Sequence, residues 1–499
     1  MPTTRPALGR CTLVGLAGGV LVLVGAAQAA SPFTSKVAGS WFFGVPEPAA
    51  RAAAPGAGGA VGVVCVWAGV ALLLVAWYRI VGAVTASSVT PRALGAVLGA
   101  WLAPIVLCPP LFSRDVYAYV AQGELLAHGM SPYRVGPAAL GAPGVVALVD
   151  PLWRHATAPY GPLFVSTGEM IVTVSRHHVL GSLVLLRAVA AVSVLVVAGA
   201  TAVIARATGR DPARAVALVA LNPLVLLVLV GGMHNDALML AFLAGGVACA
   251  YRDRPVVGVV LCAVGATVKL PALVGVLAIG WVWADRGAPR VERLRRLGSA
   301  VTVGAGTLAL VGVLAMLGWG WLWDVGGPGA VVSWLDPATA VGLAADHLGS
   351  ALGLGSHRDG AVRVARALAL AAAVVTVLVL VGRTERRRAP GALGGGLLAG
   401  ALLGPAVWPW YVTWCVPFLA TSGRRARAAL VVVCTWACFA DVPPASSLSG
   451  AGPGVVVLAV ALALAAVSTG WLWCAPVRVA DGLSGSPRWE GRARAPGAP

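Results

Sequence analysis

The sequence predicts an all-helical, polytopic membrane protein with about fourteen transmembrane helices. Hydrophobic residues make up 59% of its 499 positions and charged residues only 11%, a balance that is not typical of a soluble domain of this size. The hydrophobic residues form long runs, and a run of about 20 is enough to cross a bilayer as a helix. We therefore expect a multi-pass protein of the cell membrane, with membrane lipid as its surroundings.

The formal charge of +18 does not indicate a nucleic-acid partner. Most arginines stand in short clusters between apolar runs, which is the pattern that orients membrane helices. The nine cysteines are scattered, with no CxxC pair and no histidine at metal-binding spacing. We expect them to be small core residues and predict no metal site.

The expected helices follow the apolar runs in order. They cover residues 11–30, 59–79, 93–112, 179–205, 214–231, 236–251, 255–268, 270–284, 298–318, 361–382, 391–408, 410–421, 427–442 and 453–474. Five arginine clusters separate them and should share the cytoplasmic side with both termini. These clusters lie at 206–214, 252–254, 286–296, 383–388 and 424–427. The loops 31–58, 113–178 and 319–360 would then face outward.

This pattern divides the chain into four parts. Residues 1–92 form an N-terminal segment with two membrane helices, and 93–440 form the membrane core, which carries the outer loops 113–178 and 319–360. Residues 441–475 supply a last transmembrane helix. The Arg- and Pro-rich tail at 476–499 has no apolar periodicity, so we expect it to be disordered on the cytoplasmic side.

The first helix has two interpretations. Arg5 and Arg10, the apolar run that follows and Ala27-Gln28-Ala29-Ala30 resemble a cleavable secretory signal. The apolar run is long for a signal, which favours a retained membrane helix. Both interpretations place residue 31 outside.

Two segments are too short for two full crossings although basic loops flank both of their ends. Residues 255–284 are expected to form two short helices that meet at Lys269, and 391–421 should turn at Trp408-Pro409-Trp410-Tyr411. Residues 160–176 are apolar, but a crossing there would place the 206–214 cluster outside. We expect that segment to be a helix that lies along the outer surface.

Asp115 is the main candidate for catalysis. It directly follows the uncharged run 93–112, so it stands where the chain leaves the bilayer, and a carboxylate at that depth is costly without a role. A surface ion pair with Arg114 is the alternative. Glu124 lies further along the same outer loop, and His234, Asn235 and Asp236 occupy a short outer turn.

Lys269 and the His234-Asn235-Asp236 turn each allow two interpretations. The chain contains one other lysine, Lys36, so a lysine at this hairpin suggests a compact charge for a phosphate. An interface lysine that reaches up to the water is equally consistent with the sequence. Asn235 and Asp236 are candidate substrate ligands or simply caps of the following helix.

Five stretches resemble one enzyme family. They are SRDVYAYVAQGELLAHGMSPYRVGPAAL at 113–140, DPLWRHATAPYGPLF at 150–164, GGMHNDALM at 231–239, VKLPALV at 268–274 and WPWYVTW at 408–414. Together they resemble the actinobacterial polyprenyl-phosphate-mannose-dependent α-1,6-mannosyltransferases, which have the C-type glycosyltransferase fold. The resemblance extends from about residue 93 to about residue 440.

The resemblance implies a membrane enzyme that takes mannose from a lipid phosphodiester outside the cytoplasm. The acceptor would be a cell-envelope glycan or lipoglycan, such as a lipomannan. Asp115 matches the acidic residue of the family's first outer loop, and Lys269 matches a basic residue that some relatives direct at the donor phosphate. Many relatives have paired acids where this chain has Arg114 and Asp115, so a divalent metal is in doubt and no cofactor is predicted.

The chemistry of sugar transfer from a lipid phosphate assigns roles to the charged candidates that agree with the resemblance. Asp115 would act as the base that removes a proton from the acceptor hydroxyl, and attack from the back face would invert the anomeric carbon. Lys269, Arg114 or Arg134 would stabilise the departing phosphate. The aromatic residues that could hold sugar faces are Tyr117, Tyr133, Tyr160, Trp410 and Tyr411, although each is also an ordinary interface residue.

Two other functions were considered. A lipid or sugar transporter or flippase would also have many helices and a few buried charges. The two halves of the chain show no internal repeat, however, and the unusual residues gather on one side. A non-catalytic assembly subunit would have little use for such a group of charged residues.

Overall fold

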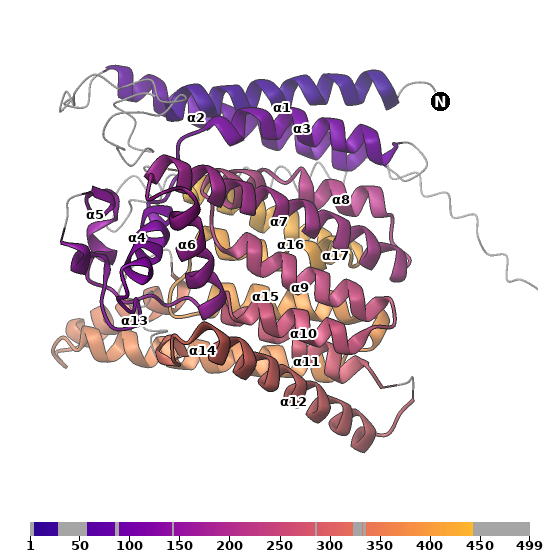
Figure 1. Ribbon diagram of the computed structural model, residues 1–499. Coiled ribbons are helices and arrows are strands. Elements are labelled where there is room, and N and C mark those ends of the chain that lie inside the picture. The colour runs from indigo at the N-terminus through magenta and orange to yellow at the C-terminus, as the bar shows by residue number, and fades with distance from the viewer. Residues whose placement is uncertain are drawn as a thin grey trace, which may run out of the picture.

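The computed structural model describes residues 4–27, 57–84, 89–141, 144–284, 287–322, 332 and 336–442. All regular elements within these ranges are helices, so the predicted all-helical class is confirmed (Figure 1). The expected helix at 453–474 and the tail at 476–499 lie outside the described residues.

Three N-terminal helices form a layer along one side of the molecule, at the top of Figure 1. They are α1 (Thr4–Ala26), α2 (Ala57–Ala83) and α3 (Pro91–Leu107). The backbones of α1 and α2 touch at Gly18 and Gly69: a Cβ added to either glycine would meet the other's carbonyl oxygen at 2.8 or 2.5 Å. Small residues allow helices in membranes to pack this closely, so this contact depends on both glycines.

The central helices begin with α7 (Val179–Ala207), which runs the length of the bundle. It is followed by α8 (Pro212–Ala220) and the π-helical η3 (Val225–Gly231), which form one candidate span bent by 55°. The bend lies at Asn222-Pro223, where proline lacks the N–H that a continuous helix needs. The Asn222 side chain accepts a hydrogen bond from the Leu224 amide at 3.0 Å and stabilises the new start.

The next helices are short, as predicted. They are α9 (Asp236–Tyr251), α10 (Pro255–Ala266), η4 (Leu270–Ala272) and α11 (Leu273–Val282), followed by the longer α12 (Arg290–Ala315). Lys269 lies between the end of α10 and the start of η4. The predicted pair of short helices meeting at Lys269 is therefore confirmed.

The C-terminal part of the bundle comprises α14 (Arg358–Gly382), η7 (Arg386–Arg388), α15 (Ala389–Leu403), η8 (Pro409–Cys415), α16 (Val416–Ala420) and α17 (Arg424–Asp441). The expected turn at 408–411 differs from the structure, because the aromatic run itself forms the 3₁₀ helix η8. Proline at its first position, where no N–H is needed, explains why the helix begins there.

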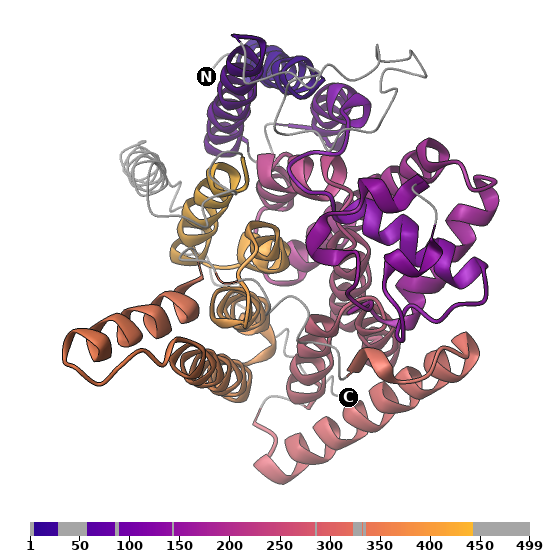
Figure 2. The same cartoon turned by 90° about the vertical axis from the view of Figure 1, so that its left-hand side faces the viewer.

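One end of the bundle carries the 113–178 segment, shown in purple beside the ends of the central helices in Figure 2. Its elements are α4 (Asp115–Ala127), η1 (Pro137–Leu140), α5 (Gly144–Leu148), η2 (Pro151–Trp153) and α6 (Pro162–Val174). The helix expected at 160–176 is confirmed as α6. The 319–360 loop contains two helices that we did not predict, η5 (Gly320–Leu322) and α13 (Pro337–Ala351), the latter capped by Asp336.

The expectation of about fourteen full crossings is not confirmed. Among the described residues, five helices are long and apolar enough to cross a membrane, or six if the bent pair counts as one span. Five further apolar helices have only 10–17 residues. At 1.5 Å per residue they are shorter than the roughly 30 Å hydrocarbon layer, because proline or charged residues interrupt the chain at their ends.

The five basic clusters do meet at one end of the bundle. Arg386 forms an ion pair with Asp253, and a Cβ added to Gly209 would lie 3.2 Å from the Arg387 side chain. Thr208 donates a hydrogen bond to the Thr421 carbonyl at 3.4 Å, just before the last cluster. The turns after α7, α9 and α11 lie at the right-hand end of Figure 1, opposite α4 and α6.

Candidate functional site

Asp115 is held at the first turn of α4 by the segment that precedes it. The Leu111 amide donates to the Gly231 carbonyl at 3.2 Å, and Phe112 has a left-handed φ of 63°, which redirects the chain. The backbone amide of Asp115 then donates to the Ser113 hydroxyl at 3.1 Å. The N-terminus of a helix favours a carboxylate, so the local fold supports a negative charge here.

The environment of Asp115 is dry. Its side chain is 15% exposed. Burial raises the pKa of Asp115 to about 6, and the nearby Lys269 ammonium opposes the rise. A carboxylate with this pKa is a stronger base than a solvated one and is still largely ionised at neutral pH.

The His234-Asn235-Asp236 turn faces Asp115 from between η3 and α9. The His234 ring stacks on Trp410 with centroids 4.1 Å apart, and its Nδ1 lies 3.9 Å from the Asp115 Oδ2. Among the described residues, neither ring nitrogen of His234 and neither polar side-chain atom of Asn235 has a hydrogen-bond partner. Buried polar groups are seldom left this way, which makes this turn a candidate ligand site.

Lys269 and Asp236 form a buried ion pair across two elements. The Lys269 Nζ lies 2.9 Å from the Asp236 Oδ1, the lysine side chain is 14% exposed and the aspartate is fully buried. The Trp414 indole N–H donates to the same Oδ1. Asp236 therefore orients Lys269 and does not cap α9 with its side chain.

Two aromatic rings also contact the Lys269 ammonium group. Its Nζ lies 4.3 Å from the centre of the Tyr411 ring and 5.4 Å from that of Trp414. Such contacts favour a cation near the ring faces. This geometry contradicts the alternative of a freely moving interface lysine, since the ammonium group is fixed by a carboxylate and two rings.

The loop that carries Lys269 is fixed by α6. The amides of Gly161 and Leu163 donate to the carbonyls of Val268 and Thr267, both at 3.2 Å. A Cβ at Gly161 would lie 2.2 Å from the Thr267 carbonyl oxygen, so only glycine permits this contact. Helix α6 and the lysine hairpin are thereby joined.

A cavity connects these groups. Its wall includes Asp115, Lys269, Tyr160, Trp408, Trp410 and Tyr411. The site combines a carboxylate, a fixed ammonium and several aromatic faces, which is the combination that would bind a sugar and a phosphate.

Two predicted residues of α4 point away from this cavity. At 100° per residue, Tyr117 is displaced about 200° and Glu124 about 900° from Asp115, which puts both on the opposite face of the helix. Ala118 and Gln122, which share the face of Asp115, line the cavity instead. The helical period, applied to 115–127, would have identified Gln122 from the sequence.

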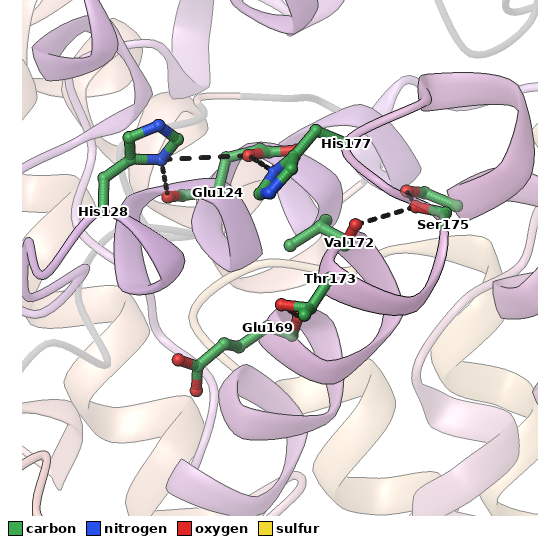
Figure 3. Close-up of polar contacts among 8 residues, drawn as sticks. Glu124, His128, Glu169, Val172, Thr173, Ser175 and His177 are labelled. Atoms are coloured by element: carbon green, nitrogen blue, oxygen red, sulfur yellow. Dashed lines mark hydrogen bonds and ion pairs between the residues drawn. The ribbon is translucent and has the colours of Figure 1, made fainter.

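Glu124 belongs to a separate group, in which a largely buried carboxylate contacts two surface histidines (Figure 3). Its Oε2 lies 2.7 Å from the His177 Nδ1 and 3.9 Å from the His128 Nδ1, and both histidines are more than half exposed. The Glu169 carboxylate points away from this group in Figure 3.

Six other predicted residues lie outside the cavity wall: His234, Asn235 and Asp236 of the turn described above, and Tyr133, Arg134 and Arg114. Tyr133 donates its hydroxyl to the Tyr160 carbonyl at 2.9 Å and so supports a wall residue. Arg134 is exposed. Arg114 is half-buried beside Asp115, and its Nε has no hydrogen-bond partner among the described residues.

The structure also reveals residues that the sequence analysis missed. Trp414 follows Tyr411 by one turn of the 3₁₀ helix, a signal present in the WPWYVTW run. Asp441, which is 2% exposed at the end of α17, lies near enough to Asp115 for their charges to repel each other. A carboxylate at the end of an apolar helix was a detectable signal.

Arg187 of α7 is the third residue that the sequence analysis missed. Its side chain stabilises the chain segments that lead into the site. Its side chain is buried and donates to the carbonyls of Val106 and Cys108 at the end of α3, and to that of Gly231 at 3.0 Å. Those two chain ends lead directly into Asp115 and into the His234 turn. No group of three or more His, Cys, Asp or Glu side chains among the described residues is placed to hold a metal ion.

Comparison with known proteins gives consistent matches. A family model described as α-(1→6)-mannopyranosyltransferase, N-terminal domain, matches residues 12–285, and one described as MptB C-terminal domain matches residues 338–471. No solved structure matches the chain.

Three relatives carry related names. The chain is 31% identical over 452 residues to α-(1→6)-mannopyranosyltransferase A of Mycobacterium tuberculosis, covering 87% of this chain and 84% of the relative. It is 34% identical to a probable α-(1→6)-mannopyranosyltransferase of Mycolicibacterium smegmatis, covering 65% and 64%. It is 30% identical to α-(1→6)-mannopyranosyltransferase B of Corynebacterium glutamicum, covering 68% and 60%.

Proposed function

The chain belongs to the α-(1→6)-mannopyranosyltransferase family and is a mannosyltransferase, and we propose that it transfers mannose from polyprenyl-phosphate-mannose to a cell-envelope glycan or lipoglycan. The proposal rests mainly on one observation, the shared cavity of Asp115 and Lys269. A base and a phosphate-binding cation are the two groups that this reaction requires. A transporter would not need them in this arrangement.

Asp115 is the proposed base. The acceptor hydroxyl attacks the anomeric carbon of mannose while Asp115 takes its proton, and the bond between that carbon and the phosphate oxygen breaks. The phosphate leaves with the bonding electrons and needs no proton, so no second carboxylic acid is required. His234, stacked on Trp410 beside Asp115, is placed to position a sugar hydroxyl.

Lys269 is the proposed ligand of the departing phosphate. The charge on the phosphate grows as the bond breaks, and a fixed cation stabilises that change without reorganising. Asp236 and Trp414 act as positioning residues, because they hold the ammonium in place. Arg114 is a second candidate cation, whereas Arg134 lies outside the cavity wall and is a weaker candidate.

The proposed stereochemistry follows from a single displacement. Attack from the face opposite the phosphate inverts the anomeric carbon, so a β-linked donor gives an α-linked product. The names of the relatives indicate an α-(1→6) linkage, and we propose the same linkage for this chain.

The site is proposed to face outward, because the basic clusters meet at the opposite end and arginines favour the cytoplasm. A cysteine at Val341 in α13, which is 64% exposed, should react with an impermeant maleimide in intact cells. A cysteine at Arg290 in α12 should react only after lysis. The unmodified chain serves as the control for its own cysteines, and reversed labelling would place the site in the cytoplasm.

The reaction itself is tested in membranes from cells that express the chain. Radiolabelled polyprenyl-phosphate-mannose is supplied with candidate glycan and lipoglycan acceptors, and labelled product is analysed for its linkage. We expect α-(1→6)-linked mannose that depends on Asp115. Transfer from a nucleotide-linked mannose in the absence of the lipid donor would contradict the proposed donor.

A further inference from the structure

A second cavity lies at the end of the bundle that carries the basic clusters, and the proposed reaction does not use it. Segments of α9, α11, α12 and α15 and the turn after α9 line it. Helix α9 connects the two cavities: it begins at Asp236 beside Lys269 and ends at Tyr251 in the second cavity. Its 16 residues separate the two by roughly 24 Å at helical rise.

The wall of the second cavity is aliphatic on its buried side and charged at its exposed side. Val247, Ile279 and Leu393 are at most 5% exposed. The side chains of Arg296 and Arg386, in contrast, are 41% and 50% exposed. This division suits an amphiphile with an anionic head and an apolar tail.

Both arginines are held by carboxylates and keep donors for a ligand. Arg386 donates through Nη2 to Asp253 and to the Ala250 carbonyl, and Arg296 donates through Nε to Glu292. A guanidinium has five N–H donors, and the structure gives these two groups no further hydrogen bond within the described residues. The ion pairs fix the two guanidinium groups and leave free donors on each.

Aromatic residues place this cavity at the level of lipid head groups. The Arg386 guanidinium lies 5.9 Å from the Tyr251 ring centre, and that of Arg296 lies 5.6 Å from Trp283. Trp and Tyr are enriched at the border between head groups and hydrocarbon. In α12 the charged residues end at Arg296, and an apolar run begins at Leu297, which marks the same border.

We propose that this cavity binds the phosphate group of an anionic phospholipid, with Arg296 and Arg386 as its ligands. The acyl chains would lie along the aliphatic wall, which an inorganic phosphate would leave empty. Guanidinium groups are well suited to phosphate because they can donate two parallel hydrogen bonds. This site does not depend on the proposed mannosyl transfer.

The test measures lipid binding by the purified full chain in detergent. Native mass spectrometry compares retention of phosphatidylglycerol with that of phosphatidylcholine, and a thermal melt records the stabilisation by each. We expect preferential binding of phosphatidylglycerol, and the double variant R296Q/R386Q should weaken it by about 10-fold or more. The control is R295Q, since Arg295 lies on the same helix and pairs with the same Glu292 but does not line the cavity.

A second variant separates a lipid site from a purely structural ion pair. D253N removes the carboxylate that competes with a phosphate for Arg386, so phosphatidylglycerol binding should stay equal or increase. If Arg386 serves only Asp253, D253N and R386Q should lower the melting temperature alike and change lipid binding in neither case. Equal binding of both lipids, an equal loss in R295Q, or equal stabilisation by inorganic phosphate would each overturn the proposal.

Discussion

Helix α4 supplies the carboxylates of two histidine–carboxylate pairs, which differ in their distance and in the exposure of the histidine, although both carboxylates are largely buried. At its first turn, Asp115 faces the buried His234 across 3.9 Å, and both ring nitrogens of that histidine have no hydrogen-bond partner among the described residues. At its last turn, Glu124 contacts the half-exposed His177 at 2.7 Å (Figure 3). The first pair keeps unused hydrogen-bonding capacity beside the cavity that Asp115 lines, whereas the second uses its capacity in a direct contact. We propose that the first pair serves a ligand and the second serves the fold.

Asp115→Asn and Glu124→Gln test this difference most directly. Removing a general base typically lowers the rate by a factor of about 10² to 10⁴, so Asp115→Asn should nearly abolish mannosyl transfer. Glu124→Gln should change the rate by less than about threefold, because Glu124 lies on the face of α4 opposite Asp115 and does not line the cavity. Transfer of radiolabelled mannose, normalised to the amount of protein in the membrane, checks both. Near-normal transfer by Asp115→Asn would move the role of base to another carboxylate, and Asp236 and Asp150, whose charges act on Asp115, are the candidates.

Lys269→Gln should produce the next largest effect. Loss of a cation that stabilises a developing phosphate charge should lower kcat/KM by about 10- to 100-fold, and Lys269→Arg should restore part of it. Arg358→Gln is the matched control, because Arg358 at the start of α14 is exposed, does not line the cavity and has no proposed role. Wild-type transfer by Lys269→Gln at all donor concentrations would rule out the phosphate role.

The pH dependence should also distinguish the two carboxylates. Burial raises the pKa of Asp115 to about 6, so the base is protonated as the pH falls through 6, and kcat/KM should fall about tenfold per pH unit below that value. Stability should change in the opposite direction to the rate as the pH falls. Burial disfavours the charged carboxylate, so Asp115 destabilises the fold above pH 6, and this destabilisation decreases below pH 6. The rate profile of Glu124→Gln should match that of the wild type. A wild-type profile with no inflection between pH 5 and 7 would contradict Asp115 as the base.

His177→Gln should have the smallest effect. The side chain is 53% exposed, and pairs of this kind contribute at most about 1 kcal/mol to stability. The melting temperature of the purified protein should fall slightly, and mannosyl transfer should be unchanged. A tenfold loss of transfer without unfolding would show that the surface pair contributes to the reaction and would invert the comparison.

Much of the fold could be predicted because proline and arginine mark the ends of helices in this chain. The placement of Lys269 between two short helices and the existence of a separate helix at α6 were both predicted from the positions of the basic clusters. The number of full membrane crossings could not be predicted, because hydropathy does not distinguish a short buried helix from one that spans the membrane. Helix α13 was missed because the 319–360 segment was assigned as an outer loop from its hydropathy, although its alanine-rich composition and Asp336 before Pro337 are recognisable helix signals.

The site was predictable in its main members and not in its geometry. The positions of the charged residues predicted that Asp115, Lys269 and the aromatic run lie on one side of the membrane, and the structure brings them to one cavity. The ion pair between Asp236 and Lys269 could not be predicted, because it depends on how α9 packs against the hairpin. No local sequence pattern encodes that packing. Glu124 and Tyr117 were assigned to the site because the segment was treated as a loop, and a helix turns both away.

Arg187 has a consequence for how the chain is made. Arg187 is the ninth of the 29 residues of the apolar helix α7, and the cost of inserting an arginine into a membrane rises to about 2.5 to 3.5 kcal/mol at the centre of a helix. Two of its carbonyl partners, at the end of α3, are synthesised before it, and the third, at Gly231, is synthesised only after α8. Because of this order of translation, Arg187 can donate to the carbonyls at the end of α3 as soon as α7 emerges from the ribosome. It can donate to the Gly231 carbonyl at the end of η3 only afterwards. The segment before Asp115 would therefore be stabilised first, and the segment before His234 second. During biogenesis, the Asp115 side of the proposed catalytic centre would form before the His234 side has been synthesised.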